Sequence, residues 1–504
     1  MVSKVKSCGI SGIEPGIVSV EVDVSSGLPN TVIVGLPDAS VRESRERIRS
    51  AIKNSHIDFP SSRITVNLVP ADTKKEGSYF DLPIALGLLE RIGVVKENAL
   101  SRFFIVGELS LDGKCAPVRG MLAIASALPK GANLICPKQN ALEAALIEDV
   151  NVFGIEDLTE AVYFLNGELE LSPAKADLEE AMKQRCDFEY DFAQVKGQRL
   201  AKRALEIAAA GRHNAIMIGP PGAGKSMLAK RLPSILPPLQ MHEAIEATKI
   251  YSLAGHMDEG LIVRPPFRFP HHTSSAAAII GGGNPPMPGE ISLAHKGVLF
   301  LDELPEFRRD VLESLREPLE EGKINIARAG AKSVKFPADF ILICAMNPCP
   351  CGYFSSKRHM CRCSANQIYR YTRKVSGPLL DRIDIHIDVA ELDPSELQKA
   401  SQEESSAQIR KRVLKAVAIQ KKRFRNENIV YNGQMNSSQI EEYCRCSESA
   451  QRVLSGAIES MGLSGRAYHK VLKVSRTIAD LDGSKDIEEE HILEALNYRK
   501  ALWA

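Results

Sequence analysis

The feature that most restricts the fold of this chain of 504 residues is a glycine-rich loop at residues 219–226. An apolar run, residues 215–218, comes directly before the loop, and a run of helical composition follows it. The spacing matches G-x-x-x-x-G-K-[ST], in which glycines let backbone amides wrap closely around phosphate oxygens. The pattern predicts a buried strand, a phosphate-binding loop, and a helix whose N-terminus faces the phosphates.

All eight residues of this loop are candidates for nucleotide binding. The lysine supplies a point charge to the β- and γ-phosphates of ATP, and the final serine offers a hydroxyl to Mg²⁺. The predicted ATP-binding residues are Gly219, Pro220, Pro221, Gly222, Ala223, Gly224, Lys225 and Ser226.

A second apolar run, residues 297–301, ends in two acids, Asp302 and Glu303. A carboxylate at the tip of a neighbouring strand can hold Mg²⁺ through water, which fits Asp302. Glu303 then lies where it can polarise an attacking water as general base. An Asp-Glu pair after a strand is also typical of a helix N-cap. Beside a phosphate-binding loop, the pair predicts a site that hydrolyses ATP with Mg²⁺.

A third apolar run, residues 340–346, ends in an amide side chain, that of Asn347. This amide can orient the attacking water or contact the γ-phosphate. The alternative is an asparagine that forms a turn before Pro348.

An arginine, Arg382, lies just before another predicted strand, residues 383–389. At the edge of a subunit, such an arginine would act in trans on the ATP of a neighbour. Pairing with Asp381 or Asp384 is the alternative.

Changes in composition divide the chain into four parts. Residues 1–168 alternate short β-rich runs with apolar helical runs, and residues 169–191 form a polar, acidic linker. Strands and helices alternate over residues 192–392, which predicts an α/β domain with a parallel sheet. Residues 393–504 are predicted to be a helical domain.

The overall charge is balanced, with 64 basic and 63 acidic residues and a net charge of +1, so any nucleic-acid surface must be local. One local concentration is residues 408–425, with eight Lys or Arg and no acid, for which a solvated helix face is the simpler interpretation. We find no apolar run that could span a membrane and no signal peptide, so we expect a cytoplasmic protein without a membrane partner.

Four of the eleven cysteines fall within 15 residues, and they are Cys349, Cys351, Cys361 and Cys363. Two Cys-x-Cys pairs joined by a short polar loop can supply four thiolates to one tetrahedral Zn²⁺. Reduced free thiols and a redox pair are the alternatives. A disulfide framework is not expected in the cytoplasm.

Two segments interrupt the α/β pattern. Residues 265–289 are rich in Gly and Pro and carry two adjacent histidines, which without further ligands are a weak basis for a metal site. Residues 323–336 are predicted to form a β-hairpin with Arg328 and Lys332 at its tip and Lys335 on its second strand. The three cations suit a nucleic-acid backbone, and an exposed turn is the alternative.

Taken together, these stretches resemble the magnesium-chelatase-like branch of AAA+ ATPases, and more closely the bacterial ComM/YifB family. The resemblance covers essentially the whole chain. The matching stretches are residues 35–38, 106–109, 219–226, 270–273, 281–283, 289–295, 347–352, 377–384 and 464–468.

The resemblance implies a homo-hexameric ring in which Asn347 is sensor 1, Arg382 the arginine finger and Arg466 sensor 2. It also implies that residues 393–504 form the helical lid domain, and that the hairpin at residues 323–336 is a pore element that grips DNA. Members of the ComM type are branch-migration helicases that act on single-stranded and branched DNA in recombination during natural transformation.

The N-terminal domain resembles the α+β fold of the Lon-protease and ribosomal-S5 type. Lon carries a serine in a D-G-P-S-A-G setting and a lysine in a G-G-L-K setting. Here Tyr79 falls at the place of the serine, Ser78 lies one residue early, and Leu122 replaces the lysine. Because tyrosine and leucine cannot form an activated nucleophile–base pair, we expect no protease activity.

Three functions from different classes fit these features. A DNA-translocating ATPase is the main hypothesis, and a metal-insertion or protein-remodelling ATPase is the rival enzyme. The Lon-like domain, which the resemblance ties to ComM/YifB proteins, disfavours metal insertion. A scaffold that binds nucleotide without turnover is disfavoured because Lys225, Asp302, Glu303 and Arg382 are all present.

Overall fold

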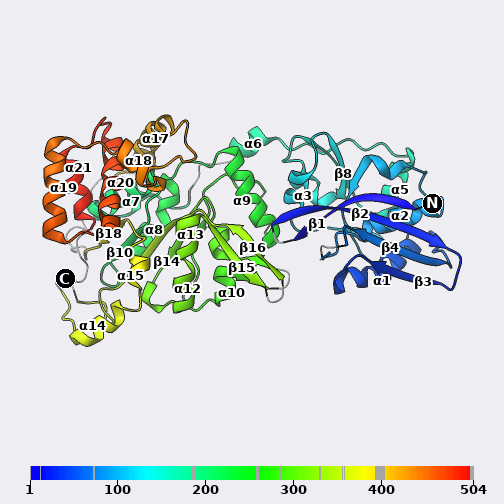
Figure 1. The fold of residues 1–504 in the computed structure, drawn as a ribbon, viewed down its shortest axis with the longest axis horizontal. Helices are drawn as coiled ribbons and strands as arrows, with labels where there is room; N and C mark the ends of the chain where they lie inside the picture. Colours follow the sequence, from blue (N-terminus) through cyan, green and yellow to red (C-terminus); the bar gives the residue numbers. More distant parts are fainter. Residues whose placement is uncertain are drawn as a thin grey trace.

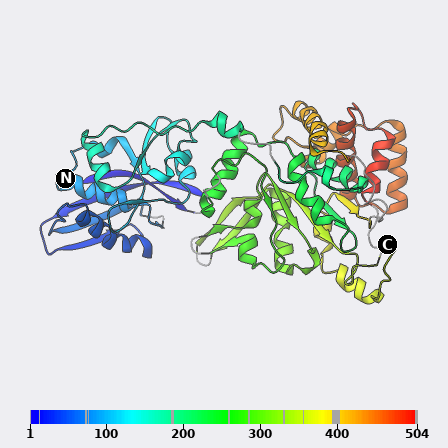
Figure 2. The same cartoon turned by 180° about the vertical axis from the view of Figure 1, so that it is seen from behind.

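The structure is a computed structural model of the chain. It describes residues 2–11, 13–71, 74–75, 77–183, 188–256, 260–283, 286–328, 331–354, 356, 358–391 and 403–499. Along the long axis an N-terminal domain, an α/β domain and a helical region follow one another, and the view from behind shows the same order (Figures 1 and 2).

The N-terminal domain is built on a seven-stranded mixed sheet with the order β3-β4-β2-β1-β5-β8-β9. The β1–β2 and β2–β4 pairs are antiparallel, and the other neighbours are parallel. The strands are β1 (Ser3–Ser11), β2 (Glu14–Ser25), β3 (Asn30–Val34), β4 (Arg63–Val69), β5 (Phe103–Ile105), β8 (Ala132–Pro137) and β9 (Val150–Ile155). A small ribbon joins β6 (Glu108–Leu109) to β7 (Cys115–Ala116).

Alternation along β2 and β4 puts one face of this sheet in the core, because valine, isoleucine and leucine occupy every second position. Helices α1 and α5 begin at aspartate caps, Asp38 and Asp157, whose carboxylates accept from the backbone N–H three residues later. The helices are α1 (Ala39–Asn54), α2 (Asp81–Arg91), α3 (Met121–Ala127), α4 (Lys138–Ala144) and α5 (Leu158–Asn166).

The linker, residues 169–191, contains one short helix, α6 (Leu178–Lys183). The N-terminal domain also packs directly on α9 (Met241–Ala254) of the α/β domain through a buried polar contact. The carboxylate of Glu143 accepts from the backbone N–H of Leu122 at 2.8 Å and from the hydroxyl of Ser252. Burial raises the pKa of Glu143. The two domains are therefore joined by a specific contact as well as by the linker.

The α/β domain contains a five-stranded sheet with the order β11-β14-β17-β10-β18, in which every pair is parallel. All residues of β10, β14 and β17 are buried, as continuous apolar runs between two helical layers require. The strands are β10 (Ala215–Ile218), β11 (Phe267–Arg268), β14 (Val298–Leu301), β17 (Ile341–Met346) and β18 (Ile385–Asp388). The predicted parallel sheet is confirmed.

The helices of this domain are mostly short. Besides α9, the described ones are α7 (Arg199–Gly211), α8 (Lys225–Arg231), α10 (Ala276–Ile280), α11 (Glu290–Leu293), α12 (Arg309–Ser314), α13 (Arg316–Glu321), α14 (Ala365–Thr372) and α15 (Gly377–Leu380). Within the segment at residues 265–289, a two-stranded ribbon pairs β12 (Gly281–Gly282) with β13 (Met287–Pro288).

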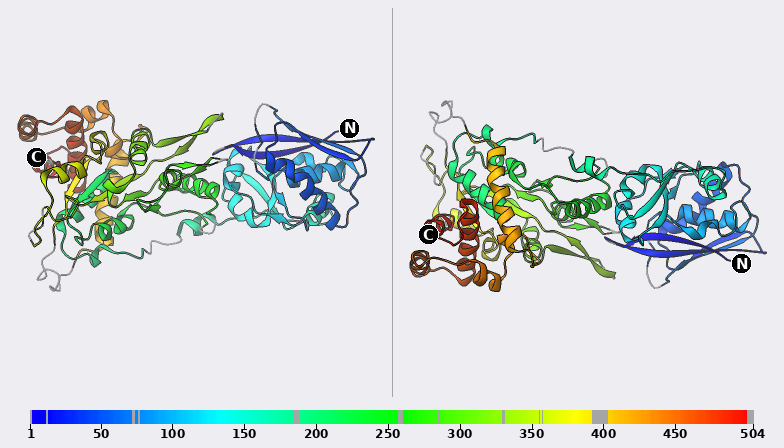
Figure 3. Two further views of the ribbon diagram at one scale, coloured as in Figure 1. Left: turned by 90° about the horizontal axis from the view of Figure 1, so that it is seen from below. Right: turned by 90° about the horizontal axis from the view of Figure 1, so that it is seen from above.

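The predicted hairpin is present as β15 (Lys323–Arg328) and β16 (Ala331–Pro337), which extend toward the N-terminal domain (Figures 1 and 3). Its strands are longer than expected, so Arg328 and Lys332 belong to strands and not to the turn. The side chains of Arg328 and Lys332 lie outside the described part of the chain. Lys335 is exposed, because Val334 and Phe336 on either side of it face the core of the α/β domain.

The C-terminal region is helical, as predicted. It consists of α17 (Ser406–Arg423), α18 (Ser437–Tyr443), α19 (Glu448–Met461), α20 (Gly465–Asp482) and α21 (Glu489–Asn497). Apolar residues of these helices share one core with α7 and with one face of the parallel sheet. Among the described residues, we find no helix with the length and hydropathy that a membrane span needs.

Candidate nucleotide site and cysteine cluster

The phosphate-binding loop connects β10 to α8 and adopts a conformation that its glycines permit. Gly222 and Gly224 have φ values of 77° and 89°, in the left-handed region. Gly219 is required for a different reason, because a Cβ atom there would lie 2.2 Å from the carbonyl oxygen of Val389. The loop therefore depends on close packing against the chain that follows β18.

The loop borders a cavity of about 320 Å³ that also receives the ends of β14 and β17. The cavity brings together most of the residues predicted for the ATP site. Its lining consists of Pro221, Gly222, Ala223, Gly224, Lys225, Ser226, Met227, Asp302, Glu303, Met346 and Asn347.

The side chain of Lys225 is held over the loop by three oxygen atoms. Its ammonium nitrogen donates to the carbonyl oxygens of Gly219 at 2.7 Å and Pro220 at 2.9 Å, and to Oδ1 of Asn347 at 3.1 Å. Burial lowers the pKa of Lys225, while the carboxylate of Asp302 acts in the opposite direction. An anionic phosphate placed here would compensate the cost of burying the ammonium group.

Ser226 and Asp302 meet at the point where the sequence predicts Mg²⁺. The Ser226 hydroxyl donates to Oδ2 of Asp302 at 2.5 Å. A hydroxyl and a carboxylate at this separation supply two of the oxygen ligands that Mg²⁺ prefers, and both line the same cavity as Lys225.

Glu303 lies at the mouth of the cavity in an unusual backbone conformation. Its φ value is 53°, and its N–H donates to Oδ1 of Asp302 at 3.0 Å. The side chain is 56% exposed, and Oε2 lies 3.2 Å from Nδ1 of His272. The spacing of residues along the chain does not predict this contact. The pair of adjacent histidines in the segment at residues 265–289 is its one signal in the sequence.

Arg382 does not line the cavity of its own chain. Its guanidinium donates to the carbonyl oxygen of Pro378 at 2.6 Å and pairs with Glu320 of α13. Both partners that the sequence suggested, Asp381 and Asp384, are replaced in this role by Glu320. Part of the Arg382 guanidinium, Nε, is buried without a hydrogen-bond acceptor among the described residues.

The chain next to Arg382 is anchored to the helical region. Oδ1 of Asp384 lies 3.2 Å from the ammonium nitrogen of Lys470 in α20, and Oδ2 lies 3.4 Å from Nδ1 of His213. Burial alone would raise the pKa of Asp384, but the charge of Lys470 and the nearby imidazole of His213 hold it well below its usual range. Arg466 lies one turn before Lys470 on the same helix and is exposed, outside the lining of the cavity.

The four clustered cysteines converge directly after Asn347. The Sγ atoms of Cys349, Cys351, Cys361 and Cys363 all lie within 4.8 Å of one another. Three of the separations are 3.3, 3.7 and 3.7 Å. Four sulfurs at the Zn–S distance of about 2.3 Å would be about 3.8 Å apart in a tetrahedron, whereas a disulfide needs about 2.05 Å. The geometry thus fits a four-thiolate metal site better than a disulfide.

Backbone groups favour an ionised thiol within this cluster. The N–H groups of Tyr353 and Arg362 lower the pKa of Cys351 to about 6. In contrast, burial raises the pKa of Cys349 to about 12.

Three family models match successive parts of the chain. "Subunit ChlI of Mg-chelatase" matches residues 20–140, "Magnesium chelatase, subunit ChlI" matches residues 191–397, and its C-terminal model matches residues 403–499. The competence protein ComM of Haemophilus influenzae is 46% identical over 97% of this chain and 95% of its own length. Protein YifB of Salmonella typhimurium is 43% identical over the same shares.

The chain belongs to the ComM/YifB family of magnesium-chelatase-like AAA+ ATPases. Similarity to the magnesium-chelatase 67 kDa subunit of Chlorobaculum parvum is more restricted, at 28% identity over 31% of this chain and 23% of that subunit. The similarity to ComM and YifB extends through the N-terminal domain, so these relatives share the whole domain order of the chain.

The structure describes the three positions that correspond to the Lon dyad, Ser78, Tyr79 and Leu122, which lie in the N-terminal domain. The hydroxyl of Ser78 donates to the carboxylate of Glu108. Burial raises the pKa of Tyr79 to about 12, which keeps the phenol protonated, and Leu122 is fully buried. The absence of protease activity and the role of this domain stay predictions.

Proposed function

We propose that this protein is an ATP-hydrolysing motor that assembles as a homo-hexamer and drives branch migration of DNA in recombination and natural transformation. The observation that carries the proposal is the convergence of Lys225, Ser226, Asp302, Glu303 and Asn347 on one cavity. Family membership supports the DNA substrate, since the relative in Haemophilus influenzae is named a competence protein. The basic hairpin, residues 323–336, offers a surface to which DNA can bind.

At the nucleotide site, the chain divides the work among few side chains. Lys225 binds the β- and γ-phosphates, and Ser226 and Asp302 hold Mg²⁺, which when bound neutralises charge on the phosphate oxygens. Glu303 accepts a proton from the attacking water, and Asn347 orients that water. The exposed carboxylate of Glu303 needs a positioning contact, and His272 supplies one.

Completion of the site requires a second subunit. Arg382 is outside its own cavity, where its guanidinium pairs with Glu320, and the Asp384–Lys470 pair anchors the chain two residues later. An arginine held in this way can neutralise charge on the ATP of a neighbour in the ring. Because Lys470 shares α20 with Arg466, one helix connects the proposed sensor 2 residue to the proposed arginine finger.

We also propose that the cysteine cluster holds one structural Zn²⁺. Four thiolates close a tetrahedral site without an open position, which is typical of structural zinc. Cys349 follows Asn347 by two residues, so the metal would restrain the loop that carries the proposed sensor 1 residue.

Two substitutions at the nucleotide site should have different effects. Glu303→Gln removes only the proton acceptor, so it should retain ATP binding and lower turnover by roughly 10²–10⁴-fold. Lys225→Ala should weaken nucleotide binding itself. Titration with a fluorescent ATP analogue and a phosphate-release assay separate the two effects. Wild-type turnover by Glu303→Gln would show that another group is the base.

Arg382→Ala should retain ATP binding and lose turnover by roughly 10³–10⁵-fold, the usual contribution of an arginine finger. Mixing it with Lys225→Ala should restore part of the activity, since some interfaces then combine an intact finger with an intact loop. The measurement is ATPase activity of mixed rings whose composition is verified by native mass spectrometry. No recovery in such rings would indicate that Arg382 acts in cis or only structurally.

Protein purified without chelators should contain about one zinc per chain, because the four thiolates form one closed site. Elemental analysis of the wild type and of Cys361→Ser/Cys363→Ser measures this directly. The double variant should lose the metal. Metal-free wild-type protein with full ATPase activity would contradict the zinc proposal.

The DNA substrate is tested at the hairpin. Arg328→Ala/Lys332→Ala should weaken binding of single-stranded DNA and reduce the slope of log affinity against log salt by about 0.7 per lost phosphate contact. Branch migration of a labelled four-way junction should require ATP and the intact hairpin. If the assembled wild-type ring neither binds DNA nor hydrolyses ATP faster with it, metal insertion or protein remodelling becomes the better function.

A further inference from the structure

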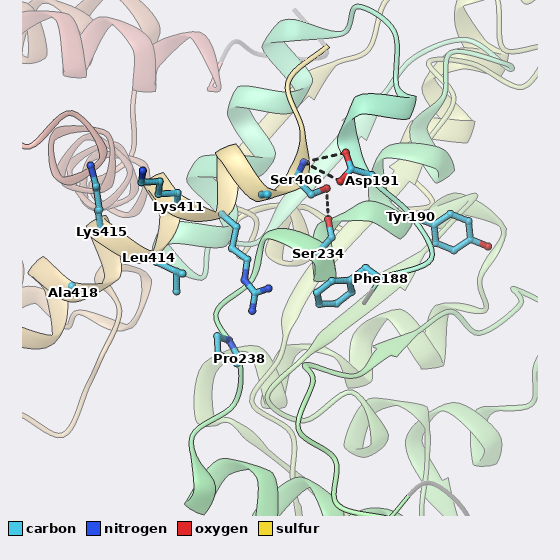
Figure 4. Close-up of a pocket in the computed structure, with 12 residues that line it drawn as sticks. Phe188, Tyr190, Asp191, Ser234, Pro238, Ser406, Lys411, Leu414, Lys415 and Ala418 are labelled. Atoms are coloured by element: carbon cyan, nitrogen blue, oxygen red, sulfur yellow. Dashed lines mark hydrogen bonds between the residues drawn. The ribbon is translucent and has the colours of Figure 1, made fainter. Parts of the chain in front are cut away.

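A large groove lies on the helical side of the molecule, away from the nucleotide cavity. Its volume is about 1120 Å³, and it opens between α17 and the end of the linker (Figure 4). None of the residues that line it lines the nucleotide cavity. We call it the α17 groove.

One wall of the groove is a second stripe along α17. Helical spacing puts Arg410, Lys411, Leu414, Lys415 and Ala418 on this stripe, while Ile409, Val413 and Val417 face the core. Leu414 is 41% exposed. Leu414 and Ala418 therefore expose apolar surface among three cations, on a side of the helix that the described chain leaves uncovered.

The basic residues of α17 fall into two groups according to their partners. Arg412 pairs with Glu206 and Glu404, and Arg423 pairs with Asp480, so these cations stabilise the fold. Lys411 and Lys415, in contrast, pair with no carboxylate of the described residues and rise along one rim of the groove (Figure 4). The simpler interpretation of the sequence is that these lysines belong to a solvated helix face. That interpretation does not account for the groove next to them.

The opposite wall contains an aromatic ring, that of Phe188, which packs against two arginine side chains. The ring of Phe188 has the guanidinium groups of Arg264 and Arg410 at 5.3 and 5.7 Å from its centroid. Nε of Arg410 is buried without an acceptor among the described residues. Asp191, the one carboxylate among the described residues that line the groove, accepts from the N–H groups of Ala193 and Ser406, at 2.7 and 3.1 Å. The groove therefore presents a net positive charge above an apolar floor.

We propose that the α17 groove binds a single strand of nucleic acid and is a second binding site in addition to the hairpin. The exposed side chain of Leu414 and the planar guanidinium of Arg410 can receive unstacked bases, while lysines one turn apart, about 5–6 Å between Cβ atoms, receive successive phosphates. A regularly charged polymer fits this rim better than an isolated carboxylate does. The inference rests on the proposed function: a motor that drives a branch must hold one strand and guide the other, and the groove is suited to the strand outside the ring channel.

The test uses the full-length protein and fluorescein-labelled oligothymidylate. Lys411→Gln/Lys415→Gln removes two phosphate contacts and should reduce the salt slope of binding by about 1.4. At 0.1 M salt this corresponds to roughly 25-fold weaker binding, if both proteins bind equally at about 1 M. Fluorescence anisotropy over a salt series measures the slope and the affinity.

Two control variants have matched positions on the same helix. Lys421→Gln/Lys422→Gln removes the same charge from the exposed end of α17 outside the groove and should bind like the wild type. Lys411→Arg/Lys415→Arg keeps the charge and should also bind like the wild type. Thermal denaturation verifies that all three variants are folded.

The possible outcomes separate this inference from the proposed function. Failure of the wild type to bind the oligonucleotide would count against the DNA motor and the groove together. Binding by Lys411→Gln/Lys415→Gln that equals binding by Lys421→Gln/Lys422→Gln would overturn the groove alone. Lys411→Gln/Lys415→Gln could instead lose the hexamer in sedimentation, while its remaining rings bind the oligonucleotide with unchanged affinity. That result would overturn the nucleic-acid site and indicate that the groove binds an acidic segment of a second copy of the chain.

Discussion

The parallel pairing of β10 with β17, and of β17 with β14, is the constraint on which the nucleotide site depends. Parallel strands end at the same edge of a sheet, so three stretches separated by many residues deliver their following side chains to one place. The loop after β10 brings Lys225 and Ser226, β14 is followed by Asp302, and β17 is followed by Asn347. The complete burial of these strands holds the edge rigid, which lets few side chains define the cavity.

A buried charge pair extends this constraint to the helical region. Asp384 and Lys470 are each 13% exposed, so removal of one partner would leave the other charge poorly solvated. Such a pair is better suited to specify a position than to add stability. It fixes α20 relative to the chain that follows α15. A movement of the helical region would therefore also displace Arg382.

The remaining features lie on either side of this centre. The cysteine cluster begins three residues after the end of β17, and the segment with His272 contacts Glu303. Farther away, Glu143 joins the N-terminal domain to α9. The nucleotide site is thus bordered by two segments of the α/β domain, the cysteine cluster and the segment with His272.

The sequence by itself determined the parts of the site that are formed by residues close together in the chain. Continuous apolar runs predicted β10, β14 and β17, the glycine-rich loop predicted the turn into α8, and the cysteine spacing predicted a cluster. It did not reveal the contacts of His272 with Glu303, of Arg382 with Glu320, or of Lys470 with Asp384. Each joins residues that are far apart in the chain, and many other charged residues have the same local pattern. Only the tertiary structure decided which of them meet, because packing and not periodicity selects the partner of a charge.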